Sequence, residues 1–329
     1  MSERSANTPM PSGMPPPLSL DLIGDAHGCA VLLEALLDRL GYRPDAAGVY
    51  RHPARQAVFL GDIIDRGPQI RETVALVRAM VEGGAAYAIL GNHEINALRA
   101  CRLEARQRHS RQRRVLKETL EQYARHQQAW NDTLDWFTQL PLCLETSNLR
   151  AVHACWDERL MRPFLERHPD GRLSRAQLER SLDPQSFYFD LVDRATRGPQ
   201  LNLPGNLSIH GRDGVQRRAF RTGFWHAHPH VYGDVVFQPD PLPESVEQRP
   251  LMEREMNQLV YYAPSERPLF FGHYWRTGRP SLLTPNIACL DYSAVKGGHL
   301  VAYRYDGEKR LSADRLVWQP ADGVRPERL

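Results

Sequence analysis

The sequence predicts an α/β fold with a mostly parallel central sheet. Three short apolar segments, residues 20–23, 57–60 and 86–90, each end in a polar loop that contains glycine. After the first two loops, residues 29–40 and 70–82 carry apolar side chains at helical spacing. Repeated strand–loop–helix units favour parallel strands joined by helices. The polar loops should then gather beyond the carboxyl ends of the strands.

The rest of the chain adds helices, an irregular stretch and more strands. Residues 95–139 are expected to be helical, and residues 160–265 show the least regular pattern. Glycine- or asparagine-containing turns flanked by apolar runs predict hairpins. The expected strand segments are 142–146 and 149–154, turned at Ser147-Asn148, then 268–272, 287–290, and a hairpin over 299–311 turned at Asp306-Gly307.

The bulk composition is that of an ordinary globular protein. The chain has 329 residues, 42% hydrophobic and 25% charged, with a net charge of +3. No segment approaches the ~18 consecutive apolar residues of a membrane span, and the charge is too small to indicate nucleic-acid binding. The five cysteines are odd in number and form no CxxC pair. They favour reduced thiols in a cytoplasmic protein.

The expected domain limits follow from the same patterns. Residues 1–17, rich in Pro, Ser and Met, are expected to form a disordered tail because they can bury little apolar surface. A single domain should span residues 18–318, with an insertion at about 204–260. Residues 319–329 should form a C-terminal tail.

Polar residues suited to divalent metal ions follow the expected strands. In chain order they are Asp25, His27, Asp62, Asp65, Arg66, Asn92, His93, His153 and His273. Carboxylate, amide oxygen and imidazole are the ligands of hard or borderline divalent metals. Asp25 and His27 can hold one ion, and Asp62 can bridge two. Asn92, His153 and His273 would complete the second ion.

Such a constellation predicts hydrolysis at phosphorus. Two ions ~3.5–4 Å apart would position a phosphoryl group and an attacking water, so no protein nucleophile is needed. Neither a GxSxG motif nor a GxxxxGK[ST] loop occurs. His93 is the expected general acid, oriented by Asp65. Arg66 and Asn92 are expected to bind the substrate phosphate.

Three sequence blocks resemble the signature of the calcineurin-like metallophosphoesterases. They are Gly24-Asp25-Ala26-His27-Gly28, Gly61-Asp62-Ile63-Ile64-Asp65-Arg66-Gly67 and Gly91-Asn92-His93-Glu94. More narrowly, they are similar to the phosphoprotein phosphatase family and to bacterial symmetrical dinucleoside tetraphosphatases. Val152-His153-Ala154 and Phe271-Gly272-His273 match the two later metal histidines of the family.

The resemblance implies a fold, a cofactor and a substrate class. The fold would be a core of two packed mixed sheets flanked by helices, with a helical and loop-rich insertion. The cofactor would be two divalent ions, manganese first, with iron, zinc or nickel as alternatives. The substrate would be a phosphate monoester, in the first place phosphoserine or phosphothreonine in a protein. The first alternative is an enzyme that hydrolyses dinucleoside polyphosphates. The second alternative is a catalytically silent phosphate-binding module.

The chain departs from the family in two places. Asp291-Tyr292-Ser293 stands where the family often has Asp-Thr-Gly. A second phosphate-binding arginine, usual in protein phosphatases, cannot be placed, and Arg212 and Arg267 are the candidates. Asp65-Arg66 together with Glu94 favour the protein phosphatase slightly over the dinucleotide hydrolase.

Two other clusters admit more than one interpretation. The run Trp225-His226-Ala227-His228-Pro229-His230 could hold a further metal ion, although an exposed loop is favoured because Pro229 interrupts the segment. The basic run between Arg99 and Lys117 is favoured as a solvated helix face. Its alternative is an electrostatic funnel for polyanionic substrates.

Overall fold

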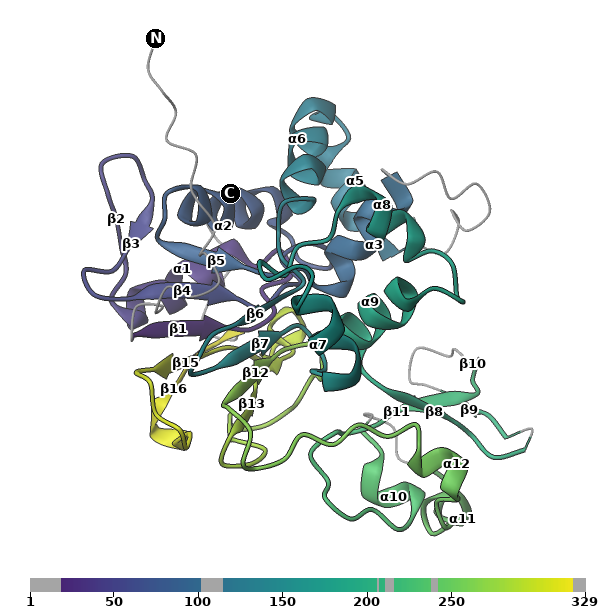
Figure 1. Ribbon diagram of the computed structural model, residues 1–329. Coiled ribbons are helices and arrows are strands. Elements are labelled where there is room, and N and C mark those ends of the chain that lie inside the picture. Colours follow the sequence, from purple (N-terminus) through teal and green to yellow (C-terminus); the bar gives the residue numbers. More distant parts are fainter. Residues whose placement is uncertain (1–18, 102–114, 206, 211–215, 238–241, 322–329) are drawn as a thin grey trace.

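A computed structural model describes residues 19–101, 115–205, 207–210, 216–237 and 242–321 (Figure 1). The predicted tail at 1–17, Arg212 and most of the basic run after Arg99 lie outside these residues. No helix in the described ranges is long and apolar enough to span a membrane.

Two mixed sheets form the centre of the molecule (Figure 1). The first contains β1 (Leu20–Ile23), β4 (Gln56–Phe59), β5 (Ala86–Ala88), β14 (Asp291–Tyr292), β15 (His299–Tyr305) and β16 (Leu316–Pro320). Its order is β14-β15-β1-β4-β5, with β16 beside β15. The second contains β6 (Cys143–Glu145), β7 (Arg150–Val152), β12 (Leu269–Phe271) and β13 (Ile287–Cys289), in the order β13-β12-β7-β6.

Alternation along the strands explains why the sheets pack face to face. Leu20, Leu22 and Val58 of the first sheet share one buried cluster with Ala151 and Phe270 of the second. The intervening side chains point to the opposite face and join the cluster that contains the helices; they are Ile23, Ala57, Phe59, Val152 and Phe271. Because successive side chains of a strand point to opposite faces, the strands of a sheet covered on both sides are apolar at most positions.

Helices cover the outer faces of this sandwich (Figure 1). α1 (Ala30–Leu40) and α2 (Ile70–Glu82) contact the first sheet. α7 (Glu158–Leu165) and α9 (Phe187–Arg197) share the apolar cluster of the second sheet, and α8 (Arg175–Arg180) contacts α9. The expected fold class, two packed mixed sheets flanked by helices, is therefore confirmed. The remaining helices of this region are α3 (Asn92–Cys101), α5 (Lys117–Tyr123) and α6 (Gln127–Phe137).

A small lobe lies beside the second sheet and has its own apolar cluster (Figure 1). Its elements are β8 (Gln200–Asn202), β9 (Ile209–His210), β10 (Gln216–Arg217), β11 (Ala219–Arg221), α10 (Tyr232–Val235), α11 (Glu244–Glu247) and α12 (Glu253–Met256). Leu201, Phe220, Tyr232 and Val246 are buried in the cluster. β11 pairs with β8, which brings its last residue, Arg221, next to Gln200. A short hairpin elsewhere comprises β2 (Arg43–Pro44) and β3 (Tyr50–Arg51).

The hairpin predicted over 299–311 is wrong in its second arm. β15 pairs instead with β16, with Tyr303 opposite Leu316. The residues after Asp306-Gly307 are Glu308-Lys309-Arg310, which lack the apolar alternation of a strand, so the chain loops before it returns. β16 extends to Pro320, so Gln319 and Pro320, expected in the tail, belong to a strand.

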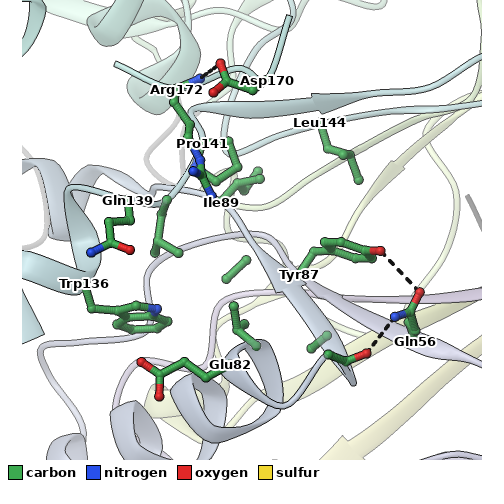
Figure 2. Close-up of a pocket in the computed structure, with 15 residues that line it drawn as sticks. Gln56, Glu82, Tyr87, Ile89, Trp136, Gln139, Pro141, Leu144, Asp170 and Arg172 are labelled. Carbon is green, nitrogen blue, oxygen red and sulfur yellow. Dashed lines mark hydrogen bonds between the residues drawn. The ribbon is translucent and has the colours of Figure 1, made fainter. Parts of the chain in front are cut away.

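A cavity of about 250 Å³ opens at the outer edge of β5. Tyr87, Trp136 and Arg172 are among the side chains that line it (Figure 2). None of the predicted metal or catalytic residues lines this cavity. The candidate functional site must therefore be sought at the strand ends.

Candidate metal centre and active site

The two sheets bring all nine predicted site residues to the loops at their strand ends. Asp25 and His27 follow β1, and Asp62, Asp65 and Arg66 follow β4. Asn92 and His93 begin α3 directly after β5, whereas His153 follows β7 and His273 follows β12. β1, β4 and β5 run parallel, as do β7, β12 and β13, so each group presents its carboxyl ends on one side.

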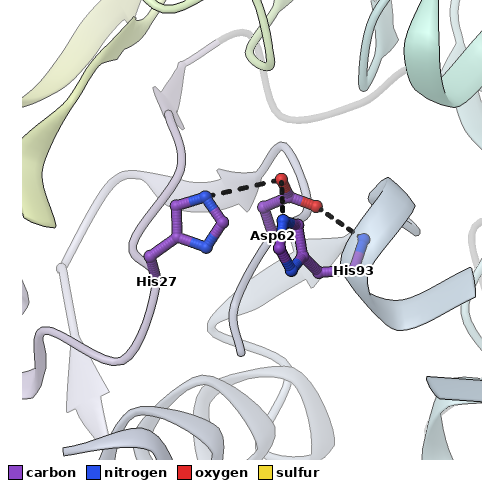
Figure 3. Close-up of side chains that lie close together, drawn as sticks. All are labelled: His27, Asp62 and His93. Carbon is purple, nitrogen blue, oxygen red and sulfur yellow. Dashed lines mark hydrogen bonds and ion pairs between the residues drawn. The ribbon is translucent and has the colours of Figure 1, made fainter. Parts of the chain in front are cut away.

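Asp62 lies at the middle of the cluster. His27 Nε2 is 3.5 Å from its Oδ2, and His153 Nε2 is 3.3 Å from its Oδ1. The rings of His27, from the loop after β1, and His93, from the first turn of α3, converge on this carboxylate (Figure 3). The backbone N–H of His93 donates to Asp62 Oδ1 at 3.0 Å. Asp62 is 1% exposed, so its charge needs partners of opposite sign.

Backbone carbonyls aim two of the histidines inward. His27 Nδ1 donates to Ile64 O at 2.9 Å, and His153 Nδ1 donates to Leu60 O at 2.7 Å. Each ring therefore turns its Nε2 lone pair toward the centre, as metal-binding histidines do. His153 Nε2 is also 3.2 Å from Asn92 Oδ1.

His273 supplies a third inward-facing ring. Its Nε2 is buried and has no hydrogen-bond partner among the described residues. Burial lowers the pKa of His273 and of His27 well below the ordinary value, so both rings are neutral at pH 7. Neutral imidazole is the form that binds metals.

Buried carboxylates crowd the same place. Burial raises the pKa of Asp25, and the neighbouring charge of Asp291 raises it further. Burial likewise raises the pKa of Asp291 itself. Asp25 accepts a hydrogen bond from the His273 backbone N–H at 3.1 Å. Several acids with so little exposure to water favour a bound cation, because each would otherwise be costly to ionise.

The buried negative charge of Asp62 also requires a positive partner, and His153 is placed to supply it. Burial would lower the pKa of His153, but the charge and hydrogen bond of Asp62, together with the charge of Asp25 and the hydrogen bond to Leu60 O, raise that pKa to about 10. Burial opposes the charge of Asp62 as well, but the neighbouring histidines hold the pKa of Asp62 well below its usual range. A proton on His153 and a divalent ion are alternative ways to balance Asp62, and metal binding displaces such protons.

These donors fit two divalent ions. One ligand atom from each of His27, Asp62 and His93 lies within 4.8 Å of the others, and the same holds for Asp62, His153 and His273. Asp62 belongs to both groups, as a bridging carboxylate would. The first group contains His93 where the sequence predicted Asp25.

The hydrogen bonds of His93 favour a catalytic role over metal ligation. Its Nδ1 is 2.5 Å from Asp65 Oδ2, and its Nε2 is 3.2 Å from the Arg66 guanidinium. Both ring nitrogens are thus engaged by other side chains. The Thr119 hydroxyl donates to the second oxygen of Asp65, which fixes the carboxylate. Thr119 comes from α5 and had no signal in the sequence.

The backbone is strained at this site. Six non-glycine residues of the described chain have positive φ, and five of them are predicted site residues. They are His27, Asp62, Asp65, Arg66 and His273, with φ between 40° and 69°, and Ser293 is the sixth. Left-handed conformations of non-glycine residues cost roughly 1–3 kcal/mol each and concentrate at functional sites. The rest of the fold stabilises these strained conformations, which orient the polar side chains of the site.

Glycines allow the loops to approach one another. A Cβ on Gly61, whose φ is +90°, would lie 2.5 Å from Gly91 N. A Cβ on Gly272 would lie 1.9 Å from Asp25 Oδ1. Both contacts are far shorter than real Cβ contacts, so the positions require glycine.

Glu94 joins two of the loops, a role that the sequence did not reveal. Its side chain is fully buried and accepts four backbone N–H groups. The donors are Asp62 at 2.8 Å, Ile63 at 2.8 Å, Gly91 at 2.9 Å and Ile64 at 3.3 Å. The only available signal was its place three residues after Gly91 in the third motif block.

Arg221, from the lobe, reaches the centre as well. Its guanidinium donates to His273 O at 3.2 Å and lies 5.0 Å from the centroid of the Tyr274 ring. Its Nε is buried and lacks a hydrogen-bond partner among the described residues. Burial lowers the pKa of Arg221, although Tyr274 and Asp291 oppose this. No periodicity or motif in the sequence had marked this residue.

Of the two arginines considered from the sequence, Arg267 lies elsewhere. It donates to Thr146 O and pairs with Glu145 of β6 at 3.3 Å. Arg212 is outside the described residues. The histidine-rich run is exposed at His226, His228 and His230, and these residues form no three-ligand group in the described part of the chain.

Comparison with known proteins agrees with this geometry. Residues 18–164 match the family model of the calcineurin-like phosphoesterases. The chain contains a calcineurin-like phosphoesterase domain. The resemblance inferred from the three motif blocks is thereby confirmed.

Curated relatives match in two ways. Over 77 residues the chain is 48% identical to the asymmetrical bis(5'-nucleosyl)-tetraphosphatase PrpE of Oceanobacillus iheyensis. This match covers 23% of this chain and 30% of the relative. Over 309 residues it is 24% identical to the symmetrical bis(5'-nucleosyl)-tetraphosphatase of Pectobacterium carotovorum, covering 91% and 96%. The chain thus spans less than a third of the first relative's length and nearly all of the second.

Solved structures share the fold. A cold-active protein-tyrosine phosphatase of a psychrophilic Shewanella species superimposes with a TM-score of 0.52 at 17% identity. The match covers 94% of this chain and 83% of that one. At this identity the likeness concerns the fold alone.

Proposed function

We propose that the chain is a metal-dependent hydrolase of phosphate esters and anhydrides. The observation that carries the proposal is the pair of ligand groups that share Asp62, beside the His93–Asp65 dyad and Arg66. Bound divalent ions would supply Lewis acidity and lower the pKa of an attacking water. Manganese is the first candidate, with iron, zinc and nickel as alternatives.

The proposed ligands are those inferred from the sequence. Asp25 and His27 would hold one ion, Asn92, His153 and His273 would hold the other, and Asp62 would be shared by both. The inward Nε2 atoms of His27 and His153 and the unpartnered Nε2 of His273 support these roles. Neutral rings and buried carboxylates are what a divalent cation requires.

His93 is proposed to protonate the leaving oxygen. When Arg66 donates to its Nε2, that nitrogen has a lone pair and the proton resides on Nδ1 toward Asp65. A phosphate that draws Arg66 away frees Nε2 to carry a proton and deliver it. Asp65, held by Thr119, keeps the ring in place and compensates its charge.

Two arginines are proposed to bind the phosphate. Arg66 is exposed and can place its fork on two oxygens, with Asn92 beside it. Arg221 comes from β11 of the lobe and lies next to His273. Its unpartnered Nε offers a further donor, and it is our candidate for the second arginine in place of Arg212 or Arg267.

For the substrate we propose a dinucleoside polyphosphate. The support is the alignment with a symmetrical bis(5'-nucleosyl)-tetraphosphatase along 91% of this chain. The sequence motifs slightly favoured phosphoproteins, and that class is the alternative. The likeness to protein phosphatase structures concerns the fold and does not decide between the two.

Metal content and turnover on a chromogenic ester test the coarser proposal. Metal-depleted protein is titrated with manganese, bound metal is counted by elemental analysis, and p-nitrophenyl phosphate hydrolysis is followed. Wild type should bind two ions per chain and turn over. Asp62→Asn keeps the side-chain volume but halves the bridging capacity, so it should lose at least one ion and nearly all turnover. The exposed Asp132→Asn is the matched control.

The substrate class is tested on the same metal-loaded protein. Diadenosine tetraphosphate and a phosphoserine peptide are compared by kcat/KM, with products identified by chromatography. We expect the dinucleotide to be preferred and to yield two molecules of ADP. Preference for the peptide would instead support the alternative proposal that the chain is a protein phosphatase. A variant Asp62→Asn with two ions and normal turnover would refute the binuclear mechanism itself.

A further inference from the structure

Trp275 is a large aromatic residue that does not take part in the core. The chain has six tryptophans. Trp130, Trp136 and Trp156 are buried, and Trp225 and Trp318 pack against the apolar clusters. Trp275 is partly exposed and belongs to none of the three clusters found in the described residues. Its indole N–H has no hydrogen-bond partner there either. A partly exposed indole without a packing role is typical of a binding surface.

Lys296 lies over this ring. Its Nζ is 5.3 Å from the centroid of Trp275. Lys296 is exposed, and no carboxylate of the described chain pairs with it. It ends the short helix η1 (Ala294–Lys296), and its backbone N–H donates to Ser293 O at 2.8 Å. A Cβ on the nearby Gly298 would lie 1.9 Å from Tyr292 O, so this turn cannot easily rearrange.

Both residues belong to chain segments that adjoin the proposed metal centre. Trp275 is two residues after His273, and its backbone N–H donates to His273 O at 3.0 Å. Their Cα atoms are therefore at most about 7.6 Å apart. Lys296 is five residues after Asp291, and Arg276 N–H donates to Asp291 O at 3.0 Å, which ties the two segments together. Trp275 follows β12 of the second sheet, and Lys296 follows β14 of the first sheet.

We propose that Trp275 and Lys296 form a subsite for the nucleoside diphosphate part of the substrate. The base stacks on the partly exposed indole, and the ammonium pairs with a phosphate that is not being cleaved. Every base has a π face, so stacking on an aromatic side chain binds nucleotides with little base preference. The lysine stem is flexible and its charge compact, so it can move from the ring face to a phosphate.

This inference rests on the proposed function and narrows it. A substrate with a base and several phosphates would use both residues, whereas p-nitrophenyl phosphate would reach only the metal centre. A phosphoserine peptide carries neither a base nor a second phosphate. The subsite would therefore contribute to selection of a nucleotide over a phosphopeptide.

Inhibition by two product analogues tests the subsite. On manganese-loaded protein, ADP and inorganic pyrophosphate are compared as competitive inhibitors of p-nitrophenyl phosphate hydrolysis, because they differ only by the adenosine. ADP should bind wild type at least about 5-fold more tightly, within the range of base–aromatic stacking. Trp275→Leu should abolish most of this ratio and Trp275→Phe should keep part of it. Lys296→Gln should weaken both inhibitors.

Matched controls separate the subsite from general effects. Trp318→Leu removes another tryptophan that carries a cation, Arg279 at 5.9 Å, but packs against the core. Lys117→Gln removes an exposed lysine that pairs with Glu121. Both should leave the ratio of ADP to pyrophosphate affinity unchanged. Should Trp275→Leu lose p-nitrophenyl phosphate hydrolysis, the Trp275→Phe variant carries the test.

The outcomes distinguish the two proposals. Equal inhibition of wild type by ADP and pyrophosphate, or a ratio unaffected by Trp275, overturns the subsite even if diadenosine tetraphosphate is hydrolysed. A ratio that depends on Trp275 supports the subsite even if the dinucleotide is not the preferred substrate. In that second case only the proposal that a dinucleoside polyphosphate is the substrate would be refuted.

Discussion

Replacement of Glu94 by glutamine should show how far one buried carboxylate holds the active-site loops together. Each oxygen of Glu94 accepts two backbone N–H groups: Oε1 takes Ile63 and Ile64, and Oε2 takes Asp62 and Gly91. A glutamine amide can satisfy only one of these pairs. In either orientation its NH₂ group faces two N–H donors, which are buried and left without an acceptor.

The expected loss of stability follows from the two lost bonds. A hydrogen bond to a charged group contributes about 1.5–3 kcal/mol, so two contribute about 3–6 kcal/mol. Burial raises the pKa of Glu94, and the charge of Asp62 raises it further, so the carboxylate is itself costly to bury. Its removal recovers part of the loss. We therefore expect the lower end, about 3 kcal/mol, a large part of the ~5–15 kcal/mol typical of a domain.

Urea unfolding of metal-depleted protein, followed by circular dichroism, measures this change. The exposed Glu121→Gln makes the same chemical substitution and should shift the unfolding free energy by less than about 0.5 kcal/mol. Elemental analysis after reloading should show weaker metal retention in Glu94→Gln, because the Asp62 and Gly91 loops are no longer joined. A variant within 1 kcal/mol of wild type that retains two ions would refute this reasoning.

Three further predictions concern the acid, the second arginine and a surface ion pair. His93→Asn should lower phosphopeptide or dinucleotide turnover on the order of 10²–10⁴-fold but p-nitrophenyl phosphate turnover clearly less, since p-nitrophenolate leaves without a proton. Equal losses in both assays would argue against His93 as the acid. Arg221→Lys keeps the charge but not the planar fork, so kcat/KM should fall about 10-fold with metal content intact; loss of metal would instead indicate a structural role. Burial disfavours the charge of Asp306, but Arg55 and Arg315 outweigh it and lower the pKa of Asp306 to about 2. Asp306→Asn should therefore cost at most about 1 kcal/mol above pH 5, a difference that disappears as pH falls from about 4 to below 2. Unfolding curves at pH 7 and pH 2.5 check this, and a difference that grows at low pH would contradict it.

Local patterns were sufficient for much of the fold and for the composition of the site. Strands such as Leu20–Ile23 are mostly apolar because both faces of their sheet are covered. The one charged residue of this strand, Asp21, is buried and pairs with Arg55. Glycines and polar residues must follow them, because a loop there has to turn and meet its neighbours. The helix predicted over 70–82 has those bounds in the structure, since its apolar spacing and the glycines at 83 and 84 are both local signals.

The interactions that complete the site depend on long-range contacts. Thr119 reaches Asp65 across 54 positions, and Arg221 reaches His273 across 52. No motif or periodicity predicts such pairs, because the sequence pattern around each residue reflects only the strand or helix in which it lies. Arg221 ends a short strand of the lobe, and Thr119 lies in a short helix.

The sequence alone determined which residues could carry the chemistry, since ligand type and order are properties of the chain. Which atoms face one another was decided only in the tertiary structure. The pairing of β12 with β7 within the second sheet brings the loops that follow them together, so His153 and His273 lie 5.1 Å apart between ring centroids. Contact between the segments that follow β12 and β14 brings Trp275 beneath Lys296. A strand can be recognised from its own residues. Which strands pair with it depends on how apolar side chains from distant parts of the chain are buried together.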